Sequence, residues 1–440
     1  MPCAAQCRHQ NRWTLYVFAF VVCSLVSGLV YGWPALRQHL RGDGSTLSER
    51  QFGAAFTAGS WSTQGCRFLT GMARDRFGTR VVASFCLLSA ACGVLGIGLL
   101  DSNDPMSLAV SLFVVGLGSG VQLTLQPVAK LFPDHAGSVL SSLSGAFQVS
   151  GLVFLTLSSL RLPRSVSYSG FSCLLLLTSV IALVILPEGV HFDDEVDDSL
   201  PSDVEEHEIV DPDDGEQDVA GTTCAADDSA VSGNCERQIG TTSAWLQIRS
   251  LEYILLLGWF SINVTPHQYY VGSIGFQLEE KGDASGFYTD LYTILYGSAA
   301  ALSPVAGLLA DRLGVSVAEG TATMLSAASL FILSSKRMTL DSQIVGLIAN
   351  SLGRMITWGS YFAHLGKRFG YRNFGTLGGL GLLVSAIVSL IQYPLIALAS
   401  DGRSSVVNQA CAAGLLATLP YCVWLYVREK RGSAELTGKV

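Results

Sequence analysis

The chain has 440 residues, of which 49% are hydrophobic and only 14% are charged, and its mean hydropathy is +0.41. Soluble domains carry about a quarter charged residues, so this composition excludes an ordinary water-soluble globular protein. The formal net charge of -8 comes largely from one acidic segment rather than from the apolar body. We therefore expect a multi-pass integral membrane protein embedded in the lipid bilayer, with no nucleic-acid partner.

Twelve apolar stretches are long enough to cross a bilayer, because a helix needs about 20 residues to span roughly 30 Å of hydrocarbon. We predict an all-α membrane protein with twelve transmembrane helices in two pseudo-symmetric six-helix halves. The predicted spans are 13–33, 51–72, 81–100, 106–129, 137–160 and 168–186 in the first half, and 251–276, 287–309, 316–334, 342–366, 374–399 and 406–427 in the second.

An acidic segment separates the two halves. It holds about half of the 35 acidic residues but a single basic residue, Arg237, and it lacks apolar periodicity. Such self-repelling runs are typical of disorder. We predict a first half at 1–186, a disordered cytoplasmic linker at 187–247, a second half at 248–427 and a cytoplasmic tail at 428–440. The linker is interpreted as a solvated tether, with a regulatory role as the alternative.

The loops indicate the orientation of the chain. If both termini are cytosolic, the loops on the cytosolic side contain more Lys and Arg than the loops on the outer side. This is the asymmetry expected of cytoplasmic loops. We therefore predict that both termini are cytosolic, and we expect the protein in the plasma membrane.

One basic loop occurs twice, once in each half. GMARDRFGTR follows the second predicted span, and GLLADRLG follows the eighth. Matching turns in two membrane-embedded halves are the internal symmetry of a secondary transporter. We interpret this loop as a conformational switch, in which Asp75 meets the N-terminus of a neighbouring helix while Arg76 and Arg80 pair with carboxylates in only one of two states. The residues of the two copies are Gly71, Asp75, Arg76, Gly78 and Arg80, and Gly307, Asp311, Arg312 and Gly314.

These loops resemble the cytoplasmic motif of the major facilitator superfamily. The second copy has Val315 and Ser316 where basic residues would follow. Within that superfamily, several stretches resemble the sodium-independent, system-L-like amino acid transporters, a branch that also contains nucleobase carriers and protist relatives. They are GLGSGVQLTLQPVAKLFP, FQVSGLVF, YYVGSIGFQLE and FGTLGGLGLLVSAIVSLIQYPL. The resemblance implies facilitated diffusion of amino acids, of the large neutral class, by alternating access. A nucleobase uniporter and a non-transporting receptor or scaffold are the alternatives.

The candidate substrate-binding residues are polar side chains inside predicted spans, where charge is costly and therefore informative. Arg354 lies in the middle of span 342–366, where a guanidinium can grip a carboxylate with two hydrogen bonds. An equally weighted alternative is a structural arginine bonded to backbone carbonyls. We interpret Arg67, near the end of span 51–72, as a snorkelling side chain. The predicted substrate-binding residues are Arg354, His267, Gln268, Gln126 and Gln392.

Energy coupling and catalysis are both expected to be absent. No Asp or Glu falls at mid-depth in a predicted span, and His267 is the best titrating group, so we predict uniport without a metal or cofactor. An enzyme needs clustered catalytic groups. The embedded histidines His267 and His364 show no such companions in the sequence, so we expect no catalytic residues.

Overall fold

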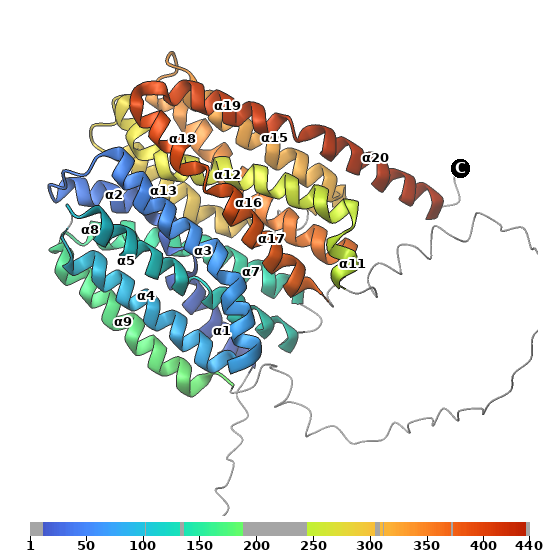
Figure 1. Cartoon of the computed structure of the whole chain (residues 1–440), viewed down its shortest axis with the longest axis horizontal. Coiled ribbons are helices and arrows are strands. Elements are labelled where there is room, and N and C mark those ends of the chain that lie inside the picture. Colours follow the sequence, from blue (N-terminus) through green and yellow to red (C-terminus); the bar gives the residue numbers. More distant parts are fainter. Residues whose placement is uncertain are drawn as a thin grey trace, which may run out of the picture.

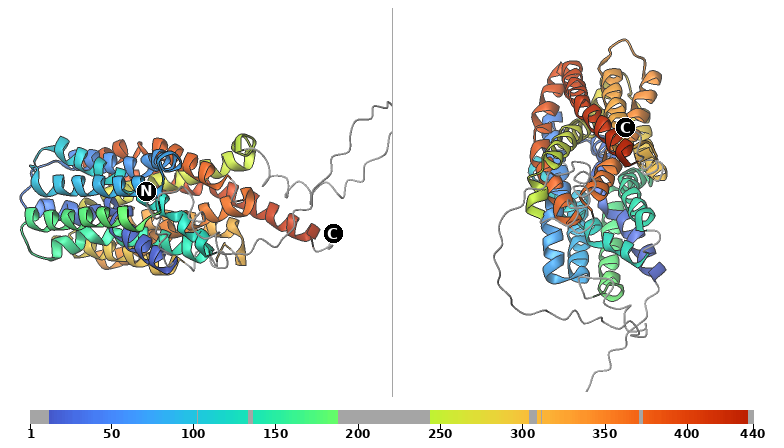
Figure 2. Two further views of the ribbon diagram at one scale, coloured as in Figure 1. Left: turned by 90° about the horizontal axis from the view of Figure 1, so that it is seen from below. Right: turned by 90° about the vertical axis from the view of Figure 1, so that its right-hand side faces the viewer.

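The computed structural model describes residues 12–101, 103–132, 136–187, 244–303, 309–310, 312–370 and 373–436, and within those ranges every regular element is helical. Most of the long helices run roughly parallel to one axis (Figure 1). The first half, coloured blue to green, and the second half, coloured yellow to red, form two adjoining bundles, which is also visible end-on in Figure 2.

The first half contains six successive helical rods, several of them interrupted. The rods match the six spans predicted for this half. Their elements are α1 (Arg12–Val22), η1 (Cys23–Ser27), η2 (Leu29–Gly32) and α2 (Trp33–Gly42); α3 (Glu49–Phe77); α4 (Thr79–Leu99); α5 (Pro105–Gly118), α6 (Val121–Leu125) and η3 (Gln126–Leu131); α7 (Ala136–Val149), η5 (Ser150–Leu152) and α8 (Val153–Ser159); and α9 (Arg164–Ile185).

The second half repeats this arrangement after the short helix α11 (Ala244–Ile248). Its elements are α12 (Leu251–Glu280); α13 (Phe287–Ser298) and η7 (Ala299–Leu302); α15 (Val315–Ser334); α16 (Leu340–Phe369); α17 (Phe374–Ser389) and α18 (Gln392–Leu398); and η8 (Ala399–Arg403), α19 (Ser404–Leu416) and α20 (Leu419–Leu436).

Local sequence signals start several helices. Ser48 accepts a hydrogen bond from the Gln51 amide, and the Gln51 side chain accepts one from the Ser48 amide, which makes a capping box at α3. Asp104 caps α5 in front of Pro105, whose fixed φ suits the first turn. Gly402, with φ +83°, makes the turn that separates the rod of α17 and α18 from that of α19 and α20.

By length and hydropathy alone, six of the described helical segments qualify as membrane spans, or seven when the pair bent by 48° at Gly28 is counted as one. The segment 374–431 counts once among the six although it turns back at Gly402. Helices α3, α12 and α16 have 29, 30 and 30 residues, which is more than the length needed to cross. Polar and charged side chains lower the mean hydropathy of these three helices, so they are not among the six.

Two predicted boundaries differ from the structure. Helix α11 begins at Ala244, inside the predicted linker 187–247, and α20 continues to Leu436, beyond the predicted end of the last span at residue 427. Charged residues such as Arg428 and Lys430 lower the hydropathy of this last turn but are good helix formers, so the helix outlasts the apolar run. Residues 188–243 of the linker lie outside the described residues.

Candidate functional site

Interrupted helices from both halves meet near the middle of the chain's helical body. Gly28, at the break after η1, donates its backbone N–H to Ser150 Oγ at 2.6 Å, at the break between α7 and α8. A Cβ on Gly28 would lie 2.2 Å from the Phe147 carbonyl oxygen, so only glycine permits this approach. Gly151 packs in turn against the ring of Tyr296 from the second half. These breaks bring Tyr31, Phe147 and Tyr296 together.

We name the resulting group the central cluster: the rings of Tyr31, Phe147, Tyr296 and Trp358. Tyr31 lies 5.5 Å from Phe147 and 6.4 Å from Tyr296 between ring centroids, and Phe147 lies 6.4 Å from Trp358. Tyr31 and Phe147 belong to the first half, while Tyr296 and Trp358 belong to the second. The central cluster therefore lies at the boundary between halves, where a transporter binds its solute.

Arg354 projects into the central cluster, as its predicted role requires. Its guanidinium carbon lies 4.2 Å from the Tyr31 ring centroid and 5.3 Å from that of Tyr296, and the residue is 1% exposed. Its Nη1 and Nη2 atoms have no hydrogen-bond partner among the described residues.

Two glutamines from opposite halves share one phenol oxygen. Gln268 Nε2 donates to Tyr31 Oη at 2.8 Å, and Gln64 Nε2 donates to the same atom at 3.2 Å. The predicted residue Gln268 thus contacts the central cluster directly, whereas Gln64 was not predicted. Its signal in the sequence was a polar residue within span 51–72, three positions before Arg67.

The other predicted binding residues lie apart from Tyr31. His267 Nε2 is 3.1 Å from Ser326 Oγ and 3.5 Å from Thr357 Oγ1, on helices of the same half. Gln392 donates to Ser60 Oγ at 2.9 Å across the boundary between halves. Gln126 is half-buried at the start of η3, and among the described residues it makes no hydrogen bond to the central cluster.

The prediction that Arg67 snorkels towards water is wrong. Arg67 is 5% exposed, and its guanidinium carbon lies 4.7 Å from the Phe147 ring centroid. Its Nε and Nη2 atoms have no hydrogen-bond partner among the described residues. The prediction used only the position of Arg67 along its helix. That position indicates the depth of the residue in the membrane but not the face of the helix from which its side chain projects.

The prediction that the embedded histidines lack acidic companions is wrong for His364. Its Nδ1 lies 2.8 Å from Glu319 Oε1, and its Nε2 lies 3.5 Å from Glu252 Oε1. Glu252 also pairs with Arg368 at 3.1 Å and with Arg428 at 2.9 Å. Glu319 is the fifth residue of α15 and is fully buried, so a carboxylate does lie inside this half, near a helix end. The residues of this group come from four helices, α12, α15, α16 and α20, so no local pattern reveals it.

In the first copy of the repeated loop, three contacts join residues of the first half to each other. Asp75 pairs with its neighbour Arg74 at 2.9 Å, and Arg76 lies over the ring of Phe77. Arg80 Nε donates to the Leu186 carbonyl at 2.6 Å, so a cation sits at the C-terminus of α9. Gly71 faces Leu123, and Gly78 has φ +82° at the turn between α3 and α4.

In the second copy, Gly307 and Asp311 lie outside the described residues. Gly314 has a positive φ of +96° and lies directly before α15. Gly78 in the first copy also has a positive φ. The carboxylate of Glu429 lies against this helix start, where Ser316 Oγ donates to it. A carboxylate at a helix N-terminus is favourable, and Glu429 supplies one here. Arg312 is exposed.

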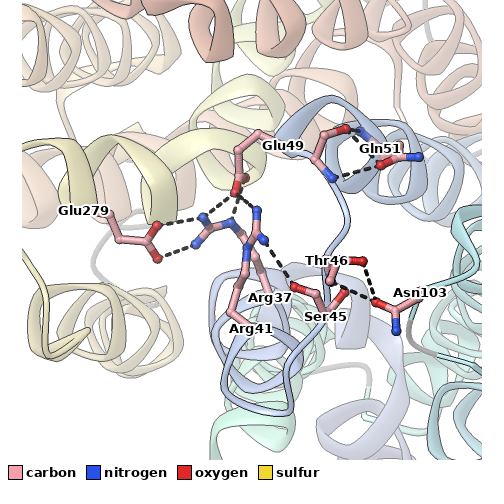
Figure 3. Close-up of polar contacts among 9 residues, drawn as sticks. Arg37, Arg41, Ser45, Thr46, Glu49, Gln51, Asn103 and Glu279 are labelled. Atoms are coloured by element: carbon pink, nitrogen blue, oxygen red, sulfur yellow. Dashed lines mark hydrogen bonds and ion pairs between the residues drawn. The ribbon is translucent and has the colours of Figure 1, made fainter.

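An ion-pair group that the sequence did not predict joins the halves at one end. We name Arg37, Arg41, Glu49 and Glu279 the Arg37 cluster (Figure 3). Arg37 bonds Glu49 at 2.8 and 2.7 Å and Glu279 at 2.7 and 2.8 Å, and Arg41 adds a 2.7 Å bond to Glu49. Gly275 leaves room for the Arg37 guanidinium, 3.1 Å from where a Cβ would lie. By the predicted topology, this is the extracellular end.

Two six-helix halves, a boundary site built from both, and ion pairs across one end together define a membrane transporter of the alternating-access class. The model of the Major Facilitator Superfamily matches residues 13–401, and the chain belongs to that superfamily. It is 24% identical to equilibrative nucleobase transporter 1 of Bos taurus over 87% of this chain and 88% of that protein. It is also 25% identical to the oxalate:formate antiporter of Oxalobacter formigenes over 34% of this chain and 35% of that one.

Proposed function

We propose that this protein is a facilitative carrier of nucleobases that binds its cargo at the central cluster. The observation that carries the proposal is the position of Tyr31 at the boundary between halves. Its ring faces Arg354, and its hydroxyl accepts hydrogen bonds from Gln64 and Gln268. Aromatic faces stack on bases, at roughly 1–3 kcal/mol per base, while amide and guanidinium groups read the base edges.

The similarity to a nucleobase transporter over most of both chains supports this cargo.

Amino acids are the second candidate, as the resemblance to system-L-like transporters implied. The terminal nitrogens of Arg354, without partners in the described part of the chain, form a fork that matches a carboxylate. If this reading is correct, Arg354→Lys should fail to restore what Arg354→Ala loses, because a point charge lacks the planar fork.

Uptake into proteoliposomes containing the purified full-length protein tests both cargoes. We expect labelled adenine to enter, and unlabelled adenine to compete with it while leucine, phenylalanine and methionine do not. The reverse pattern of competition would assign amino acids as the cargo. A protein that moved none of these solutes would instead fit a receptor or scaffold role on this fold.

We further propose uniport, with both termini in the cytosol and the protein in the plasma membrane. The orientation is supported by the excess of Lys and Arg in the loops assigned to the cytosol. Cleavage of segment 188–243 by an extracellular protease in intact cells would contradict this orientation.

A further inference from the structure

Two buried guanidinium groups, one from each half, lie on neighbouring rings of the central cluster. Arg67 lies over Phe147, Arg354 lies over Tyr31, and the centroids of those two rings are 5.5 Å apart. Arg67 and Arg354 are 5% and 1% exposed. The proposed function uses only Arg354, so Arg67 needs a separate explanation.

The protein itself offsets only part of the cost of burying these two charges. Removing an ion from water is costly, and a cation–π contact offsets only part of that cost. Among the described residues, no ion pair joins either guanidinium to a carboxylate, and four of their nitrogen atoms lack a hydrogen-bond partner of good geometry. A bound anionic ligand can therefore supply the negative charge that Arg67 and Arg354 lack.

Resting on the proposed function, we infer that Arg67 and Arg354 form a two-cation site for a planar organic anion, which bridges the halves through its charged oxygens. The flat body of the anion packs on the rings of the central cluster. Because Arg67 belongs to α3 and Arg354 to α16, an anion held by both guanidinium groups contacts both halves at once. Binding then favours closure of the halves around the cargo.

Two sources share this chemistry: a deprotonated oxopurine and an aromatic carboxylate. Urate and benzoate represent them, because both are anions at neutral pH. Hypoxanthine and benzamide are their uncharged counterparts, and benzamide matches benzoate closely in size and shape. Binding to the purified full-length protein and uptake into proteoliposomes separate charge from shape.

We expect benzoate to bind about tenfold or more tightly than benzamide, since charge-assisted hydrogen bonds are about twice as strong as neutral ones. An inside-positive membrane potential should speed urate uptake and leave hypoxanthine uptake unchanged. Arg67→Gln should remove most of the preference for the anion, whereas Arg67→Lys should keep much of it. A purely structural role for Arg67 would not change the ratio of anion to neutral binding. Arg337→Gln, at an exposed cation, is the matched control.

Equal binding of benzoate and benzamide, with urate uptake indifferent to potential, would overturn the inference. If hypoxanthine were still transported, the proposed function would stand. Tight binding of benzoate without any bound or transported purine would support the two-cation site and refute the nucleobase cargo. If Arg67→Gln failed to fold, the inference would still be tested on the unmodified protein, by comparing benzoate with benzamide binding and urate with hypoxanthine uptake.

Discussion

The guanidinium of Arg37 in the first half and the carboxylate of Glu279 in the second form two parallel hydrogen bonds, of 2.7 and 2.8 Å. Arg37 is almost fully buried, while 45% of the Glu279 side chain is exposed. This pair holds the two halves together at the end of the bundle that the predicted topology places outside. An alternating-access cycle must break it each time that end opens.

Glu279→Gln should shift the conformational equilibrium towards opening at this end. The variant keeps the shape of the side chain but loses the charge-assisted bonds, and partial exposure limits the effect to about 1 kcal/mol, a several-fold change in population. Spin labels at the exposed residues Met106 and Met338, in a background without native cysteines, would report the distance between halves. Glu280→Gln is the matched control, and equal distances in both variants would contradict the prediction.

Mild acidification should leave the pairing of Glu49 with Arg37 and Arg41 intact. Burial raises the pKa of Glu49, but hydrogen bonds and charge from Arg37 and Arg41 outweigh this, and the pKa is held below its ordinary value of 4.5. A depressed pKa means that the pairing contributes stability above the ordinary value and loses it as pH falls through the lowered one. The loss of thermal stability caused by Glu49→Gln should therefore be the same at neutral pH and after acidification to the ordinary value. A loss that disappeared in the range of an unperturbed glutamate would refute this.

Asp75→Ala and Arg80→Ala should each slow transport while leaving membrane insertion intact. Arg80 binds the last carbonyl of the sixth rod in this structure, and the switching hypothesis requires the loop to find other partners when the inner end closes. Initial uptake rates, normalised to the amount of inserted protein, provide the measurement. Arg337→Ala serves as the control, and normal rates in both loop variants would remove the switching role.

Transport should proceed down the solute gradient in either direction and continue when sodium is replaced by choline. His267 contacts two hydroxyl groups rather than an acid. The buried Glu319–His364 pair is the other group able to bind a proton. A pH gradient that alone drove uphill accumulation would show coupling. Separate tests of His267→Gln and Glu319→Gln would then identify the residue responsible.

The Glu319–His364 pair should matter more for stability than for transport. Removing one partner of a buried ion pair costs about 3–5 kcal/mol, because the other is left without compensation. His364→Ala should therefore lower the thermal unfolding temperature more than His267→Ala, whose partners are neutral hydroxyl groups. An equal loss of stability in the two variants would indicate that His364 is not charged in the folded protein.

The sequence alone was sufficient to predict the twelve rods, the two halves and the superfamily. Apolar length and the repeated loop are local properties, and a bilayer requires its spanning helices to satisfy their own backbone hydrogen bonds. Arg354 was also identified, because a charge in the middle of an apolar helix is conspicuous in any arrangement of the neighbours. Gln268 was singled out as one of several polar residues inside an apolar span, and its role in binding is a proposal.

Only the tertiary structure decided which polar residues meet. Arg67 points to the central cluster because α3 presents that face to the broken helices of Tyr31 and Phe147, a choice that position along α3 does not contain. His364 acquires Glu319 from another helix, and Arg37 reaches across to Glu279. Each of these contacts joins residues far apart in the chain, so its formation depends on how the helices rotate and pack rather than on any local pattern.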